Sequence, residues 1–242
     1  MRGRTVLGFV LSLALLSPSL GAAQGGGSLN EVLVTASRIG ADEDTETPHV
    51  VVVRRADNLV VSVVVTCDTR DAAARANELR DTVRNLLRDA ERDPRIDVGL
   101  DDQESGLVAQ FNEGLIASNT RPGGRPDTST ISFLIKTPIT ADDTFPVAKA
   151  RMDAFVARVT KVGRSEVSVS GEYQLSLVEP RQYRTAIIKA IAADAQAAAA
   201  AFGTGYQARL TGLQRPLSWY RFGDLDLALF IPYTLEIAPP GQ

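Results

Sequence analysis

The 242-residue sequence contains only one cysteine, Cys67, and only one histidine, His49. A single cysteine excludes an internal disulfide, and without a second histidine or cysteine the chain does not complete a usual zinc site. No metal and no cofactor are therefore predicted. Cys67 ends an apolar run, which favours a small buried side chain over a reactive thiol.

Lysine is scarce as well, because 22 of the 26 basic residues are arginines. Several of these arginines stand beside an acidic residue, as in Arg70-Asp71 and Arg88-Asp89, which is typical of solvated helix faces. The formal net charge is −3, and the sequence has no basic stripe that would neutralise a phosphate backbone. Nucleic acid is therefore not an expected partner.

Long hydrophobic runs are absent beyond the first 23 residues, so no transmembrane span is predicted in the mature chain. Residues 1–23 have the pattern of a secretory signal peptide: Arg2 and Arg4, an apolar stretch over residues 6–16, and small residues ending at Ala23. The sequence thus predicts export to the periplasm or cell envelope. A retained membrane anchor is the alternative for this segment.

Residues 24–48 are predicted to be a flexible linker, because they combine a glycine–serine stretch with an acidic patch. Within the linker, residues 31–39 (Glu-Val-Leu-Val-Thr-Ala-Ser-Arg-Ile) resemble the N-terminal peptide of TonB-dependent outer-membrane receptors, which pairs as a strand with TonB. The resemblance implies a TonB-like periplasmic partner, with Glu31, Val32, Val34 and Thr35 as partner-binding residues. The alternatives are a disordered tether or an added edge strand.

The chain is not itself such a receptor. A barrel of 22 strands at about 10 residues each, with its plug, needs more residues than follow the peptide.

Residues 49–238 are predicted to form one α+β domain, followed by a short tail at 239–242. Apolar residues alternate with polar ones over residues 166–177, and this period of two predicts a strand. Over residues 186–202 apolar residues recur at three- and four-residue steps, and this pattern predicts an alanine-rich helix that lies close to a sheet. Other helices are expected from Thr69 or Asp71 to Asp93, with Asp68 as the N-cap candidate, and at 142–160. Strands are expected at 50–53 and 59–66 (as a hairpin), 96–100, 107–111, 128–136, 206–213 and 225–237.

These patterns predict a largely antiparallel sheet with amphipathic helices packed on one face. The order of elements resembles the SIMPL-domain family of bacterial exported proteins. The likeness rests on the hairpin that leads into the helix at 71–92, on the Asp194-Ala195 pair of the alanine helix, and on the closing strand at 225–237. The resemblance implies a periplasmic or envelope location, ring-like homo-oligomers and no agreed enzymatic activity.

The densest aromatic cluster is Trp219-Tyr220-Arg221-Phe222, in a stretch interpreted as a loop. Trp219, Tyr220 and Phe222 are candidate partner-binding residues, because clustered aromatic side chains are common at interfaces. The alternative is that these rings pack back on the protein's own core.

Carboxylates are the remaining candidates for chemistry. Asp101 and Asp102 would point to opposite faces of a strand, whereas Asp224 and Asp226 would share a face and could hold calcium, although a solvated turn is favoured. The sequence shows no nucleophile with a matching base, so no catalytic residue is assigned and no enzyme is predicted. We expect an exported protein that acts by binding or homo-oligomeric assembly. The alternatives are a carboxylate-dependent envelope hydrolase and a TonB-interacting accessory protein.

Overall fold

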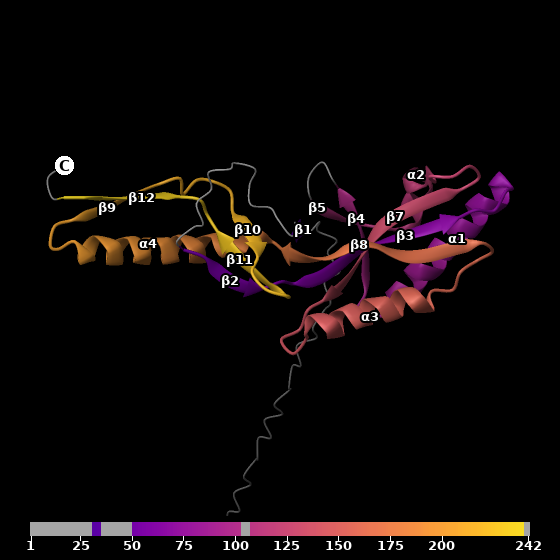
Figure 1. The fold of residues 1–242 in the computed structure, drawn as a ribbon, viewed down its shortest axis with the longest axis horizontal. Helices are drawn as coiled ribbons and strands as arrows, with labels where there is room; N and C mark the ends of the chain where they lie inside the picture. The colour runs from indigo at the N-terminus through magenta and orange to yellow at the C-terminus, as the bar shows by residue number, and fades with distance from the viewer. Residues whose placement is uncertain (1–30, 35–49, 103–106, 240–242) are drawn as a thin grey trace, which may run out of the picture.

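The computed structural model describes residues 31–34, 50–102 and 107–239. The predicted signal peptide, most of the linker, Thr35 and His49 lie outside the described residues. Within them the chain is an α+β protein with a largely antiparallel sheet, as predicted, and is drawn out along one axis (Figure 1).

The largest sheet has seven strands and curls into a barrel-like shape. Its order is β3 (Asn58–Cys67), β8 (Ser165–Val178), β1 (Glu31–Val34), β5 (Leu107–Gln110), β4 (Asp97–Asp102), β7 (Ser129–Pro138) and β6 (Arg121–Pro122). Because β3 also pairs with β7, the sheet returns on itself, and β6 adds to β7 outside this circuit. All of its pairings are antiparallel.

Two amphipathic helices, α1 (Ala72–Glu91) and α3 (Phe145–Arg158), cover one face of this sheet. The core joins Leu79 and Val83 of α1 and Phe155 of α3 to alternate residues of β3, Val61 and Val63 among them. This alternation follows from the period of two along a strand. Short helical turns, η1 (Glu113–Leu115) and α2 (Ile116–Asn119), lie between β5 and β6.

The N-cap of α1 is Asp71, whose Oδ1 accepts a hydrogen bond from Ala74 N at 2.7 Å. The prediction of Asp68 as the cap was therefore wrong. Asp68 instead accepts a hydrogen bond from Arg164 Nε at 2.7 Å, which is also the largest of the effects that lower the pKa of Asp68.

The remaining elements form two smaller sheets. One has the order β10 (Ser218–Arg221), β11 (Asp226–Phe230) and β2 (Val52–Arg55); the other is the pair β9 (Gln207–Thr211) and β12 (Thr234–Ala238). The predicted hairpin of 50–53 with 59–66 was wrong, because β2 pairs with β11 whereas β3 pairs with β7 and β8. The run at 225–237 divides around Pro232 into β11 and β12, which belong to different sheets.

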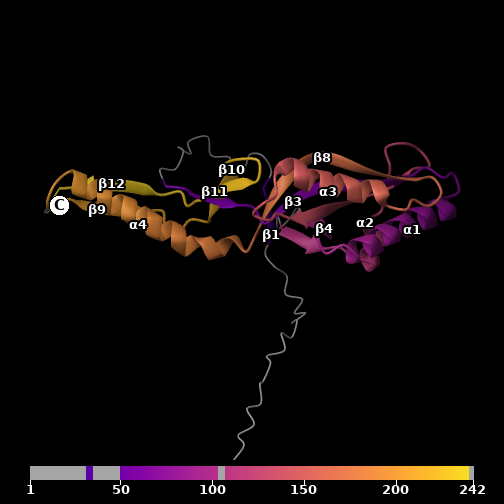
Figure 2. The ribbon, with the colours of Figure 1, turned by 90° about the horizontal axis from the view of Figure 1, so that it is seen from below.

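The helix α4 (Arg184–Ala201) follows the turn η2 (Pro180–Tyr183) and packs on the pair β9–β12. Its buried residues are Ile187, Ile191, Ala195 and Ala199, at four-residue steps. Two of these are isoleucines and two are alanines, and the helix packs on a sheet, as predicted. We call α4, β9 and β12 the arm, which projects from the barrel-like sheet at the end of the molecule away from α1 (Figures 1 and 2).

Candidate functional site

The structure places five of the seven predicted partner-binding residues on two neighbouring strands. Glu31, Val32 and Val34 lie on β1, and Trp219 and Tyr220 lie on β10. These strands contact each other where the barrel-like sheet meets the three-stranded sheet, although nearly two hundred residues separate them in sequence.

Strand β1 is an internal strand of the barrel-like sheet. Its residues Glu31–Val34 lie opposite Val178, Leu177, Ser176 and Leu175 of β8, and Val32 also lies opposite Leu107 of β5. Both edges of β1 therefore face strands of its own chain. Residues 31–34 therefore lie inside the sheet and not at its edge, and pairing of these residues with a partner would require their release from β8 and β5.

The side chain of Glu31 anchors β1 inside the curled sheet. Glu31 is only 2% exposed, and its Oε1 accepts hydrogen bonds from Asn58 Nδ2 at 2.7 Å and from Ser176 Oγ at 2.5 Å. Its Oε2 forms an ion pair with Lys136, whose Nζ also lies 3.2 Å from Asp97 Oδ2. Both carboxylate oxygens of Glu31 are therefore satisfied although the group is out of water.

Lys136 is held in its charged form. Burial acts against the charge, but the hydrogen bond and the negative charge of Glu31, with help from Asp97, outweigh burial and raise the pKa of Lys136. A charged ammonium is not a nucleophile. The cluster of Glu31, Lys136, Asn58 and Ser176 is thus suited to holding a strand and not to covalent chemistry.

The aromatic cluster lies on a strand, so its interpretation as a loop was wrong. Tyr220 packs against Phe230, with ring centroids 6.0 Å apart, and Trp219 is half-buried opposite Leu229. Trp219 Nε1 is buried and finds no hydrogen-bond partner in the described part of the chain. Phe222, just after β10, is 59% exposed. Two of the three rings therefore pack on the protein itself.

A group that the sequence did not reveal lies beside β10. The hydroxyl of Tyr173 donates a short hydrogen bond to Asp153, whose Oδ2 lies 2.5 Å from Lys149 Nζ. Burial and then the hydrogen bond to Asp153 raise the pKa of Tyr173. The i,i+4 spacing of Lys149 and Asp153 was a signal for this ion pair, but nothing in the sequence indicated the contact of the pair with Tyr173.

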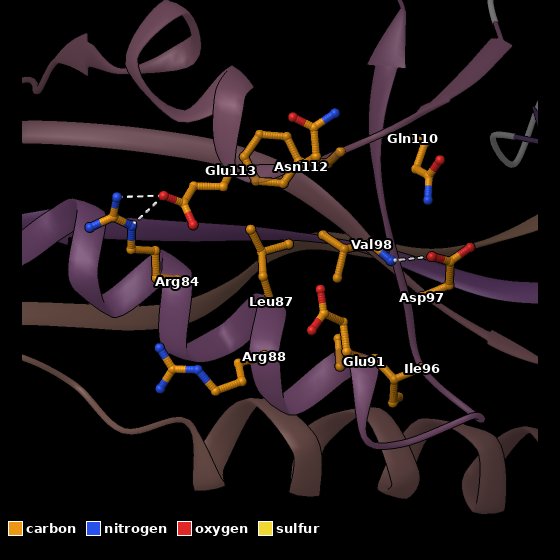
Figure 3. A pocket seen from close by; sticks show the side chains of 12 residues that line it. Arg84, Leu87, Arg88, Glu91, Ile96, Asp97, Val98, Gln110, Asn112 and Glu113 are labelled. Carbon is orange, nitrogen blue, oxygen red and sulfur yellow. Dashed lines mark hydrogen bonds and ion pairs between the residues drawn. The ribbon is translucent and has the colours of Figure 1, made fainter.

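A shallow cleft of about 310 Å³ lies between α1 and the segment from β4 to η1 (Figure 3). Its apolar part includes Leu87, Ile96 and Phe111, and Arg84 and Glu113 face each other across its rim, with Arg84 Nε 2.7 Å from Glu113 Oε1. The full lining comprises Arg84, Leu87, Arg88, Ala90, Glu91, Ile96, Asp97, Val98, Gln110, Phe111, Asn112 and Glu113. Two of its carboxylates are neutralised, Glu113 by Arg84 and Asp97 by Lys136.

Other acidic residues of the described chain are also held by bases or by the backbone. Asp143 is buried, and its Oδ1 lies 2.6 Å from Arg151 Nη2; burial opposes its charge, but hydrogen bonds from Thr140 and Arg151 lower its pKa. At Asp226, the first residue of β11, the backbone carbonyl and not the carboxylate accepts a hydrogen bond from Phe222 N at 2.9 Å. Within residues 31–34, 50–102 and 107–239, no group of three or more His, Cys, Asp or Glu side chains is placed to hold a metal ion.

No protein-family model, curated protein or solved structure matches this chain. The resemblances to the SIMPL-domain family and to the TonB-dependent receptor peptide thus stay predictions. None of the helices in the described ranges is long and apolar enough to cross a membrane.

Proposed function

We propose that this chain is an exported periplasmic or cell-envelope protein that acts by homo-oligomeric assembly and has no catalytic activity. One observation carries the proposal: the pair β9–β12 lies on a projecting arm, and among the described residues each of these strands pairs on one side only. An unpaired strand edge presents backbone N–H and C=O groups that a strand of another chain can pair with.

A second arm is a suitable partner for these edges. The pair β9–β12 has five residue pairs, and an isolated two-stranded sheet is only marginally stable in water. Its outer face is polar, with Arg209 directly opposite Glu236, whereas its inner face, which includes Leu210 and Leu235, is partly covered by α4. Strands added from a second copy would widen the sheet and place α4 beside its counterpart.

Light scattering coupled to size-exclusion chromatography of the chain without residues 1–23 tests the proposal. We expect a mass that is a multiple of one chain, and a monomer at micromolar concentration would refute assembly.

Cysteine cross-linking locates the contact. Because Cys67 is the chain's single cysteine and is fully buried, an introduced cysteine supplies the accessible thiol. We expect cross-linked dimers from Thr211→Cys and Thr234→Cys, tested separately and mixed. Ser132→Cys, on an exposed position of β7, is the control and should not cross-link. Equal cross-linking of the arm and control variants would contradict assembly through the arm.

A further inference from the structure

The guanidinium of Arg75, near the start of α1, is largely buried but has no carboxylate at hydrogen-bond distance within the described chain. Its side chain is 14% exposed. Nε donates to Ser129 Oγ at 3.1 Å, and Nη1 donates to the carbonyls of Thr69 at 2.6 Å and Arg70 at 3.2 Å, so these acceptors are all neutral. Asp127 Oδ1 lies 4.0 Å from Nη1, too far for a hydrogen bond. Because a buried charge is ordinarily paired, the environment of Arg75 still lacks part of its negative charge.

Two further arginines line the same cavity as Arg75. The cavity has a volume of about 580 Å³ and is formed mainly by β6 and the loop that leads to β7, which contribute Arg121 and Arg125. Arg121 donates to backbone carbonyls, that of Thr120 at 3.3 Å among them. Among the residues that the structure describes, the only ion pair within this cavity is the long one between Arg75 and Asp127. Three guanidiniums and one carboxylate therefore leave a net charge of +2 around the cavity.

A neighbouring acidic side chain, Asp68, is already paired. The charge of Arg125 contributes to the lowered pKa of Asp68, but the largest contribution is a hydrogen bond from Arg164. Arg164 contacts both carboxylate oxygens of Asp68, with Nε 2.7 Å from Oδ1 and Nη2 3.0 Å from Oδ2. Asp68 is therefore balanced by Arg164 and does not compensate the arginines of the cavity.

The backbone of the loop is fixed before any ligand binds. Gly123 N donates to Thr128 O at 2.7 Å, which closes the loop where β6 pairs with β7. Pro122 and Pro126 each restrict φ to about −65°. A site whose backbone is already ordered loses less conformational entropy when it binds a ligand. The cavity lies beside the start of α1, at the end of the molecule away from the arm (Figure 1).

We propose that this cavity binds a phosphate group through Arg75, Arg121 and Arg125. A guanidinium is planar, and its N–H groups match the oxygens of a phosphate in pairs. A phosphate monoester carries about −1.5 to −2 charges at pH 7 and so balances the +2 of the cavity, whereas a carboxylate would balance only half of it. Ser129 Oγ accepts from Arg75, so its own proton can be donated to a ligand oxygen. The inference goes beyond assembly and does not depend on it, because one chain supplies all of these residues.

Isothermal titration calorimetry of the chain without residues 1–23 tests the proposal. Inorganic phosphate and glucose 6-phosphate are the two probes, and they distinguish a free phosphate from a phosphate ester. Arg121→Gln/Arg125→Gln removes two charges at exposed positions, and the affinity should fall roughly a hundredfold, at about tenfold for each lost hydrogen bond to a charged group. Arg92→Gln/Arg181→Gln is the matched control, because it removes the same charge at exposed positions elsewhere, and it should bind like the parent chain. Binding of neither probe by the parent chain, or equal affinities of the two double variants, overturns the proposal.

Thermal unfolding provides a second measurement. A ligand that binds only the folded chain raises its melting temperature. The probe that binds should raise the melting temperature of the parent chain and of the control, and should leave that of Arg121→Gln/Arg125→Gln unchanged. Acetate at the same ionic strength controls for screening and for a singly charged anion. An equal rise with acetate overturns the assignment to phosphate. The mass of any oligomer should be the same for Arg121→Gln/Arg125→Gln and the parent chain, so a failure of assembly is measured separately.

Discussion

Replacement of Lys136 by methionine should destabilise the protein strongly. The ammonium of Lys136 forms the ion pair with the carboxylate of Glu31, which is 2% exposed, and the substitution leaves that carboxylate with only the neutral donors of Asn58 and Ser176. Removal of one partner from a buried ion pair costs about 3–5 kcal/mol. This is a large fraction of the roughly 5–15 kcal/mol that separates a folded domain from its unfolded chain.

Two controls separate the buried charge from other effects of Lys136→Met. The double variant Glu31→Gln/Lys136→Met removes both charges, while the amide oxygen can still accept from Asn58, so most of the lost stability should return. Lys161→Met breaks the ion pair with Glu166, in which the side chains are 41% and 73% exposed, and should change stability by less than about 1 kcal/mol.

Urea unfolding of the chain without residues 1–23, followed by far-UV circular dichroism, gives the free energies of unfolding. Hydrogen exchange adds a local measurement, because loss of β1 should expose amides among residues 175–177 of its partner β8, whereas Val178 N donates to Asp57 Oδ2. If Lys136→Met costs no more than Lys161→Met, or if the double variant is no more stable than Lys136→Met, the buried charge of Glu31 does not depend on Lys136 for its stabilisation.

Two further predictions concern glycine conformation and acid stability. Gly163→Ala should lower the free energy of unfolding by about 2 kcal/mol or more, because φ is 58° and the new Cβ would lie 2.1 Å from Glu78 Cδ. Gly171→Ala, where φ is 78° and the space around the new Cβ is open, should cost only about 1–2 kcal/mol. Equal melting temperatures of the two variants would contradict this difference. Hydrogen bonds from Arg95 and then Arg158 lower the pKa of Asp93 in the folded protein. The contribution of the Asp93 carboxylate to the stability of the fold is therefore complete above about pH 5. This contribution is lost as the pH falls through the ordinary pKa of an aspartate, near 4, toward the lower folded value. As the pH is lowered from neutral to acid, the free energy of unfolding should fall more steeply for the parent chain than for Asp93→Asn. Parallel pH profiles of the two proteins would contradict a stabilising role of the Asp93 carboxylate.

Local periodicity was enough to predict the long elements. The alternation over residues 166–177 became β8 (Ser165–Val178), and the steps over residues 186–202 became α4 (Arg184–Ala201). Each pattern reports which face of an element is buried, and that depends on residues only a few positions apart. The floor of α4 was less predictable, because β9 and β12, which form it, follow the helix at different distances along the chain.

Pairing between strands could not be predicted in the same way. The residues after β2 looked like a hairpin turn, but in the fold they connect two sheets. Ala56 N donates to Leu225 O at 2.9 Å, and Asp57 Oδ2 accepts from Val178 N at 2.7 Å. A turn-like sequence therefore joined strands whose partners lie more than 60 residues away, at β7, β8 and β11.

The same limit applied to the candidate site. The extended, β-branched character of residues 31–39 predicted a strand that pairs with another strand, but nothing local identified the acceptor. The side chains that hold Glu31 come from Asn58, Lys136 and Ser176, which are 27, 105 and 145 residues away in sequence. Such a cluster exists only after the sheet has curled and brought β3, β7 and β8 around β1.

The position of β1 bears on which strand can be offered to a partner. A strand has two edges, and β1 already lies between β8 and β5, so donation of this segment to a TonB-like protein would open the barrel-like sheet and separate Glu31 from Lys136. The strands β9 and β12 each keep one edge unpaired within the described chain and lie on the arm, away from Lys136. Association through the arm therefore leaves the buried ion pair intact, whereas association through β1 must break it. The closed state of the sheet thus favours the arm as the surface of assembly.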